Sequence, residues 1–442
     1  MFLAINHLLF VKQLQIVKQK MLFNKKTTTE RNKIIVKSVD NNGKKSAKSK
    51  DLFANQKDIN KNKHISKSTR YNMLIAVDTL NFGDVARVIV DLANYLVKHN
   101  VGVTILTNEA TMKNLLNANV NLVINQHKTL KSQIKYANFL RDIFTKYEID
   151  ISNVFSLSFV QEIRSLSLKR QIPMIATIGE IYKTETRFDR FLANIMVNAD
   201  RVIVMSEFIR DYVLNEYEVD IKKMKLIING IDLSLFKTEE ITEGRLAEVA
   251  EKIDVNASYR RILLCPSRFC DEKGQSFLLD VLAEIENKDY VCVMMGNLSK
   301  EGKVVDDLCK KVRQLNLENN VRIVDNIDDM PAAYLLSYAV ICVSQKDEAF
   351  CRIPIEAAAM RRPIISTVTG ASNMYIIDNK TGFLVRVGGK KELQDAIEKI
   401  LDMPDEEYQQ MCDNADRYAR KHFDMNKSLA EFDKIMNELL NT

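Results

Sequence analysis

The chain is short of glycine and has no cysteine pattern typical of a disulfide framework or a zinc site. Glycine supplies 13 of 442 residues, below the ~7% of average proteins. No Gly-x-Gly-x-x-Gly motif opens either half, which argues against a dehydrogenase. All seven cysteines lie in the C-terminal half, without a Cys-x-x-Cys pair, and indicate reduced thiols of a cytoplasmic protein. Five scattered histidines add no metal-binding pattern.

Long apolar runs and an evenly spread positive charge are also missing. No stretch reaches the ~18 apolar residues of a membrane-spanning helix. The formal net charge is +6, but residues 1–70 hold 17 Lys and Arg against 4 Asp and Glu, so the remainder carries a net charge of −7. A folded body without a basic excess argues against nucleic acid as a partner.

Residues 1–70 are predicted to be a disordered basic extension. Lys, Asn, Ser and Thr dominate most of it, and such a composition buries too little apolar surface to fold alone. Near its start, Phe10, Leu14, Val17 and Met21 recur at helical spacing. An amphipathic helix followed by a basic tail would suit an anionic membrane surface. A solvated tail is the alternative, and a transit peptide is disfavoured because the cations are mainly Lys.

From Tyr71 onward, short β-branched runs alternate with helical patterns. In the first helical pattern, Val85, Val88, Leu92 and Leu96 form one apolar face. This alternation predicts an α/β fold with parallel, doubly wound sheets. The expected strands span residues 73–80, 102–107, 120–124, 151–155, 173–178, 201–206, 225–229, 262–266, 290–296, 321–325, 340–344 and 363–368.

A charged, non-periodic stretch around residues 237–258 divides this pattern into two halves. We expect an N-terminal Rossmann-like domain at 71–240 and a second at 258–402, ending in a helix at 390–401. Residues 403–442 are expected to form C-terminal helices. Two such sheets joined by a linker would face a cleft between their carboxyl edges, which is where a large ligand binds.

Two glutamates close to the run at residues 339–344 are the strongest functional signal. Glu348 follows this predicted strand on a loop, and Glu356 lies in the first turn of a helix that Pro354 is expected to open. The carboxyl edge of an open α/β sheet is the ligand-binding edge, and a helix N-terminus there attracts anions. Two carboxylates beside an anion-binding helix N-terminus suit a ligand that carries both hydroxyls and phosphates, such as a sugar nucleotide. The simpler readings are an ion pair for Glu348 and a helix-dipole contact for Glu356.

A second motif follows the strand at 262–266. Arg268 and Lys273 stand on the turn before a helix, where both could reach one anion. Arginine offers a fork of donors to a phosphate and lysine a point charge. If both hold a diphosphate, no divalent metal is needed to neutralise it. The alternative is a pair of surface cations.

These motifs together resemble the large family of retaining glycosyltransferases with the GT-B fold, of the family 4 type. The resemblance covers about residues 72–425 and rests on their order along the chain. It is strongest in 260–402, where the sequence around residues 349–356 is similar to bacterial enzymes of cell-envelope polysaccharide synthesis. The motifs that carry it are Arg268 with Lys273 and Gly274, Glu348 with Glu356, Thr381–Val385 and Asn229–Asp232.

The resemblance implies a role for each matching residue. Arg268 and Lys273 would bind the donor diphosphate and support its departure, while Glu348 would contact the transferred sugar. Glu356 would accept hydrogen bonds from the ribose. The other donor-binding positions implied are Phe350, Cys351 and Arg352, through their backbone N–H groups, together with Gly83 and Gly370 in glycine loops.

The sequence also departs from the family pattern. Gly179 stands where the family often has a histidine, although Glu180 next to it could take over part of that role. Ala349 and Cys351 replace two glycines of the acidic loop, which restricts the backbone there. Asn373 replaces a common acidic residue after Gly370. These departures raise the alternative of a weakened protein that only binds its ligand.

The sequence therefore predicts a glycosyltransferase that moves a sugar from a nucleotide-sugar donor to a glycan or lipid-linked acceptor, with retention and without a metal or other cofactor. A binding or scaffold subunit and a sugar-nucleotide epimerase are the alternatives. A cytoplasmic location is expected, with the cytoplasmic face of the inner membrane as an option. Cations that suit either a membrane-facing patch or a solvated face are Lys128, Lys131, Lys135, Lys183, Arg187 and Arg190.

Overall fold

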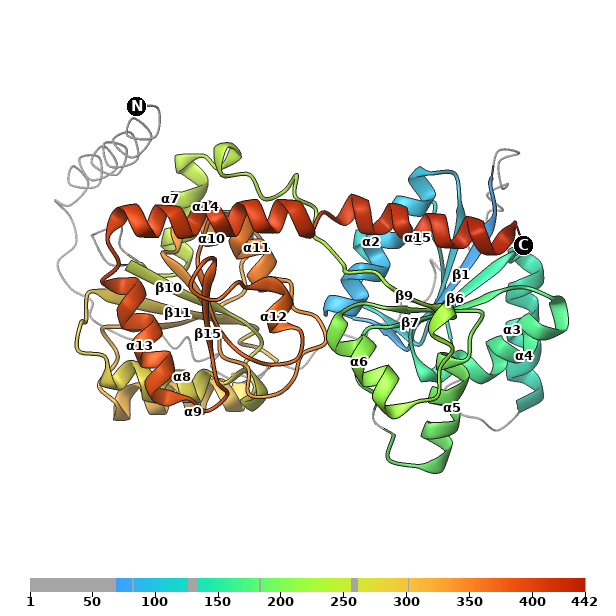
Figure 1. Cartoon of the computed structure of the whole chain (residues 1–442), viewed down its shortest axis with the longest axis horizontal. Coiled ribbons are helices and arrows are strands. Elements are labelled where there is room, and N and C mark those ends of the chain that lie inside the picture. The colour runs from blue at the N-terminus through green and yellow to red at the C-terminus, as the bar shows by residue number, and fades with distance from the viewer. Residues whose placement is uncertain are drawn as a thin grey trace, which may run out of the picture. The chain divides into compact units, whose positions relative to one another are not determined.

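Two parallel sheets with helices on both faces form the part of the chain that the computed structural model describes (Figure 1). The described residues are 69–81, 83–125, 133–182, 184–255, 261–300 and 302–441, with the side chains of 133–135 left out. The predictions for the basic extension up to residue 68, and for Lys128, Lys131 and Lys183, lie outside them. No helix in the described ranges is long and apolar enough to cross a membrane.

The first sheet has seven strands, all parallel. Its central strands are buried along most of their length and are rich in Met, Ile, Val, Leu and Ala, because helices cover both faces. The strand at 151–154 also buries Ser152 and Asn153, whose side chains hydrogen-bond to Ser167 and Thr177. The spatial order of the strands is β5 (Asn121–Ile124), β3 (Gly102–Thr107), β1 (Asn72–Ala76), β6 (Ile151–Val154), β7 (Met174–Ile178), β8 (Arg201–Val204) and β9 (Met224–Leu226).

Helix α2 (Asp84–Lys98) shows why the helices of this half lie where they do. Its buried residues include Val88, Leu92 and Leu96, which confirms the predicted apolar face. Leu92 and Leu96 pack on the first sheet, whereas Val88 belongs to a cluster that includes Met205 and residues of the second half. Val85 is only partly buried. The other helices of this half are α3 (Gln133–Lys146), α4 (Val160–Arg170), α5 (Arg187–Val197) and α6 (Glu207–Glu216).

The second sheet has six parallel strands. In spatial order they are β12 (Val321–Asp325), β11 (Tyr290–Gly296), β10 (Arg261–Pro266), β13 (Ala339–Cys342), β14 (Ile364–Thr367) and β15 (Gly382–Val385). Its helices are α8 (Gln275–Glu284), α9 (Gly302–Gln314), α10 (Met330–Leu336), α11 (Ile353–Ala359), α12 (Ser372–Tyr375) and α13 (Lys390–Leu401).

Three helices lie outside this simple alternation. Helix α7 (Glu243–Lys252) forms inside the charged connecting stretch, and its Val249 packs into a cluster with Tyr334 of α10. Helix α14 (Asp405–His422) packs on α11. Helix α15 (Met425–Leu440) follows at once but packs on α2, so the end of the chain returns to the first sheet (Figure 1).

The predicted fold class is confirmed, and most strand boundaries agree within two residues. Two differences have clear causes. The strand expected at 73–80 ends at Ala76, because the chain turns at the carboxyl edge, and Thr79–Leu80 instead pairs with Glu109–Ala110 in a separate two-stranded sheet. The edge strand Gly382–Val385 was not predicted, since it is only four residues long and begins with glycine.

The return of α15 can be tested at Phe432, which is fully buried in the core of the first sheet. Replacing it by alanine removes a large side chain and leaves a cavity, so Phe432→Ala should lower the free energy of unfolding by about 3–5 kcal/mol in urea titration. Phe191→Ala is the matched control, because that ring is 50% exposed. Equal, small effects of both variants would contradict the packing of α15 on this core.

Candidate active site

Both sheets have a point where neighbouring strands are followed by connections in opposite directions. In the second sheet this point lies between β10 and β13, since β11 and β12 extend to one side and β14 and β15 to the other. Ligands of open α/β sheets bind at the carboxyl ends of such strands. The loop after β10 carries Arg268 and Lys273, and the loop after β13 carries Glu348. The topology therefore brings these predicted residues to one place.

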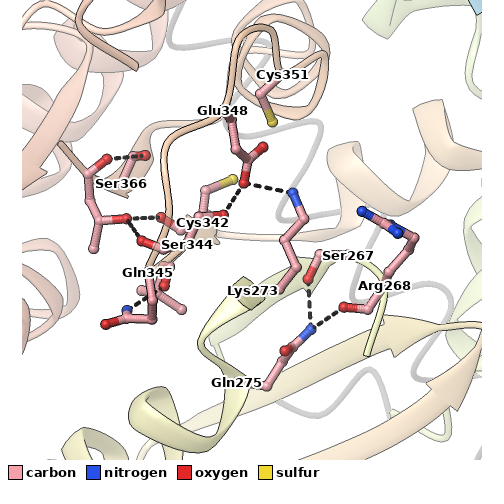
Figure 2. A network of polar contacts seen from close by, with 12 residues as sticks. Ser267, Arg268, Lys273, Gln275, Cys342, Ser344, Gln345, Glu348, Cys351 and Ser366 are labelled. Carbon is pink, nitrogen blue, oxygen red and sulfur yellow. Dashed lines mark hydrogen bonds and ion pairs between the residues drawn. The ribbon is translucent and has the colours of Figure 1, made fainter. Parts of the chain in front are cut away.

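Lys273 and Glu348 form a direct ion pair across the two loops (Figure 2). The Nζ atom of Lys273 lies 2.6 Å from Oε1 of Glu348, and the side chains are only 16% and 20% exposed. Ser344 donates a hydrogen bond to the same carboxylate oxygen. Burial lowers the pKa of Lys273, but Cys351 and Glu348 nearby raise it more, so the net shift is upward and the ammonium stays charged.

Arg268 is exposed on the same loop, and its guanidinium forms no ion pair with any described residue. Figure 2 shows its guanidinium on the same side of the loop as the ammonium of Lys273. The amide Nε2 of Gln275 donates to the backbone oxygen of Arg268 at 2.7 Å and to Ser267 Oγ at 2.8 Å, which fixes the loop. The loop therefore offers two cations, and the guanidinium of Arg268 is available to bind an anion.

Gly274 ends this loop, and the structure leaves no room for a side chain at this position. Its φ is +70°, a left-handed conformation, and a Cβ there would stand 2.1 Å from the backbone oxygen of Val343. Because Val343 directly follows β13, this contact sets how close the Lys273 loop comes to the loop of Glu348. The glycine is therefore explained by packing between the two loops.

Glu356 lies in the first turn of α11, as predicted, although this helix begins at Ile353, one residue before the expected start at Pro354. The hydroxyl of Tyr334 donates to its Oε2 atom at 2.9 Å, and Nε of Arg352 lies 3.2 Å from Oε1. Both carboxylate oxygens thus have one partner, and each keeps a further lone pair for another donor.

The remaining predicted residues of the acidic loop hold its shape. Phe350 is buried and meets Tyr375 edge to face, with ring centroids 6.0 Å apart. The N–H of Cys351 donates to the Tyr375 hydroxyl at 3.3 Å. Gly370 has φ of +49°, and a Cβ there would stand 2.2 Å from the Glu348 backbone oxygen. The donor contacts expected of these residues stay predictions.

The two lost glycines of this loop cause no backbone strain. Neither Ala349 nor Cys351 is among the described residues with positive φ, so alanine and cysteine fit the backbone that is observed. Gly179, in contrast, occupies a filled space. A Cβ there would meet the sulfur of Met205 at 2.6 Å and a methyl of Val85 at 3.2 Å. A larger side chain at residue 179 would require both to move.

The first half contributes an acid that the sequence analysis did not identify. Gly83 is exposed with open space around it, and Asp84 follows as the first residue of α2. Burial raises the pKa of Asp84 to about 6, and nearby Arg352 and Lys273 oppose the rise, while Glu348 and Glu356 add to it. The signal was present in the sequence, since an acidic residue directly follows the predicted glycine.

Sequence reasoning also missed Tyr334 and Ser344, which contact the two glutamates. Each is an ordinary residue of a helix or a strand end, and only the folded chain places it near Glu356 or Glu348.

As for metals, the described residues contain no cluster of three or more His, Cys, Asp or Glu side chains that would suit an ion.

Two parallel, doubly wound sheets of this order, followed by C-terminal helices, are the architecture of the GT-B class of glycosyltransferases. Comparison of the sequence with protein-family profiles agrees. Residues 249–422 match the family described as "Glycosyl transferases group 1", and residues 85–235 match "Glycosyltransferase Family 4". The two matches cover both halves in the expected order, and the chain belongs to the group 1 glycosyltransferases.

Two solved structures illustrate the shared fold. A glycosyltransferase from Rickettsia africae has a TM-score of 0.76 at 24% identity, covering 84% of this chain and 98% of the other. HepE from Anabaena, crystallised with UDP-glucose, has a TM-score of 0.73 at 19% identity, covering 83% and 100%. At sequence identities this low, the structural similarity is evidence of a shared fold alone.

Curated relatives are also distant. Spore coat protein SA of Bacillus subtilis is 23% identical over 228 residues, which is 49% of this chain and 60% of that protein. Alpha-monoglucosyldiacylglycerol synthase of Streptococcus pneumoniae is 25% identical over 282 residues, covering 60% and 62%. The chain therefore spans about 60% of the length of these relatives.

Asp84 gives a test of the charge arrangement. Its pKa of about 6 lies above the ordinary 3.8, so the folded protein binds this proton more tightly and loses stability as the pH rises from about 4 to 6. Asp84→Asn should therefore be more stable than the wild type at pH 7, by on the order of 1–2 kcal/mol, and equal to it near pH 4. Chemical denaturation at several pH values measures both. A constant difference across this pH range would contradict the burial of Asp84.

Proposed function

We propose that this protein transfers a sugar from a nucleotide-sugar donor to an acceptor hydroxyl with retention of anomeric configuration, and that it does so without a metal cofactor. The observation that carries the proposal is the ion pair between Lys273 and Glu348 at the strand-order reversal of the second sheet. Arg268 lies on the loop of Lys273, and Glu356 lies in the helix that follows the loop of Glu348. A group 1 glycosyltransferase fold and a related structure crystallised with UDP-glucose support a nucleotide-sugar donor.

The two cations account for the leaving group. As the bond between the anomeric carbon and the diphosphate oxygen breaks, negative charge grows on the diphosphate. Arg268 offers paired donors and Lys273 a point charge, placed in advance so that no reorganisation is required. The acceptor oxygen then bonds to the anomeric carbon on the same face, and its proton leaves with the diphosphate. Two chain cations make a metal unnecessary for this charge balance.

The two acids would hold hydroxyl groups. Glu348 accepts hydrogen bonds from Lys273 and Ser344. A diphosphate on Lys273 would loosen this ion pair and leave Glu348 available to the hydroxyls of the transferred sugar. Glu356 keeps free lone pairs for the two ribose hydroxyls. Neither acid has to transfer a proton for this role.

A lipid-linked acceptor is the form of this proposal that the surface supports. Helix α5 follows the carboxyl end of β7, and it exposes Phe188 and Phe191 by 59% and 50%, with their rings stacked at 6.2 Å. Arg187 and Arg190 beside them form no ion pair with any described residue. Exposed aromatic rings flanked by arginines suit a lipid interface. One relative's name, alpha-monoglucosyldiacylglycerol synthase, also points to a lipid acceptor.

A binding subunit without turnover is the second candidate. The specific observation in its favour is Gly179, where Met205 and Val85 fill the space that a catalytic side chain would need. Donor consumption separates the two candidates. A protein that binds nucleoside diphosphates but consumes no donor from a broad panel, with or without lipid acceptors, would support the binding role; release of an epimer without any acceptor would instead indicate an epimerase.

Arg268→Ala and Lys273→Ala test the leaving-group site. Each removes a cation that stabilises growing negative charge, so kcat for donor consumption should fall by about 100-fold or more. Lys310→Ala is the control, because Lys310 is an exposed lysine of α9 that pairs only with Asp307. Turnover unchanged in both test variants would remove the proposed leaving-group site.

The acceptor proposal is tested by vesicle flotation. Phe188→Ser combined with Phe191→Ser should reduce binding to vesicles of phosphatidylglycerol and phosphatidylcholine by at least fivefold, since two apolar anchors are lost. Leu168→Ser is the matched control: this leucine is 63% exposed near the C-terminal end of α4, whereas the two phenylalanines lie near the N-terminal end of α5. Equal flotation of the double variant and the wild type would contradict the membrane contact.

A further inference from the structure

Four charges of alternating sign run from α2 of the first half to α11 of the second. Arg87 and Asp91 pair within α2, with Nε to Oδ1 at 3.1 Å. Arg352 and Glu356 pair at 3.2 Å, also four residues apart. The link between the two pairs is Arg352 Nη1 to Asp91 Oδ2, at 3.4 Å. Arg352 thus bridges the two halves of the chain.

The bridge is largely shielded from water. The side chains of Asp91 and Arg352 are each 12% exposed, and that of Glu356 is 15% exposed. Charges at this depth are stable only when they are paired, and removing one partner strands the other. Burial lowers the pKa of Arg352, but Glu356 and Asp91 raise it more, so the guanidinium stays charged.

The network determines where Glu356 points. Arg352 holds one carboxylate oxygen and the fully buried Tyr334 holds the other. The guanidinium is itself held from the far side by Asp91. With Asp91 in place, Arg352 has one arrangement that satisfies both acids. Without it, the guanidinium is free to turn, and Glu356 loses one of its two fixed contacts.

We propose that Asp91 is a positioning residue for the donor: acting through Arg352 and together with Tyr334, it holds Glu356 in the orientation that receives the donor's ribose. Asp91 itself contacts no part of the donor. The inference rests on the proposed function, because it requires a nucleotide at Glu356. It also links donor binding to α2, the helix that starts at Gly83 and Asp84.

The direction of the change in UDP affinity distinguishes a positioning role of Asp91 from a purely electrostatic effect of its charge. Asp91→Asn removes a negative charge near an anionic ligand, and by charge alone this change would tighten binding. Positioning predicts the opposite. We expect the dissociation constant for UDP, the probe used, to rise about tenfold in titration calorimetry, the size of effect that loss of a charged hydrogen bond brings. KM for the donor should rise in parallel, while kcat changes by less than threefold.

Asp433→Asn is the matched control. Asp433 is a similarly buried acid, 16% exposed, and it pairs with Arg70 far from Glu356. Each variant loses a partly buried contact between a carboxylate and an arginine, so thermal unfolding measured for both separates stability from positioning. Asp433→Asn should leave UDP binding within twofold of the wild type.

A double-mutant cycle provides the second readout. If Asp91 acts through Arg352, then Asp91→Asn should have no further effect on UDP binding in an Arg352→Gln background. Tyr334→Phe, which removes one hydroxyl and no charge, should weaken UDP binding about fivefold without changing this coupling. Asp91→Glu should restore part of the affinity.

Each possible result of these binding experiments either supports or contradicts the positioning role of Asp91. UDP binding unchanged or tighter in Asp91→Asn, or additive effects of the two substitutions, would overturn the positioning role while leaving the proposed function intact. A wild type that binds none of the nucleoside diphosphates of adenine, guanine, cytosine, uracil or thymine would contradict the proposed function and this inference with it. Weaker binding with full coupling to Arg352 supports the inference.

Discussion

The ion pair between Lys273 and Glu348 is the contact on which the candidate site depends. It joins the loops that follow β10 and β13, and these strands are neighbours only because the strand order reverses between them. Gly274 lets the loops meet. The pair is largely buried, so each charge has its partner at a place that water reaches poorly.

Further side chains contact the charged residues of the site and orient them. Tyr334, Asp91 and Ser344 each contact one of the charged side chains, and none belongs to the motifs that carry the family resemblance. Asp84 adds an acid at the start of α2, beside two cations and two glutamates. Because Lys273 pairs with Glu348, a diphosphate that binds Lys273 must compete with this carboxylate.

The departures from the family pattern have separate physical outcomes. Ala349 and Cys351 fit the backbone without a left-handed conformation, so the loss of glycine there is harmless to the fold. At Gly179 the neighbours Met205 and Val85 have closed over the position. The first departure leaves the backbone of the acidic loop unstrained, whereas the second leaves no side chain at a position where the family often has a histidine and motivates the binding-subunit alternative.

The fold class, most strands, the apolar face of α2 and the two groups of charged residues could be predicted from the sequence alone, because hydrophobic periodicity and loop motifs are local properties. Which of these charges form pairs could not be predicted in this way. The pairing of Lys273 with Glu348 spans 75 residues and that of Asp91 with Arg352 spans 261, and such contacts follow from strand order and helix packing. The return of α15 to the first sheet is of the same kind: an amphipathic helix specifies that one face is buried, and the connectivity of the whole chain selects the partner.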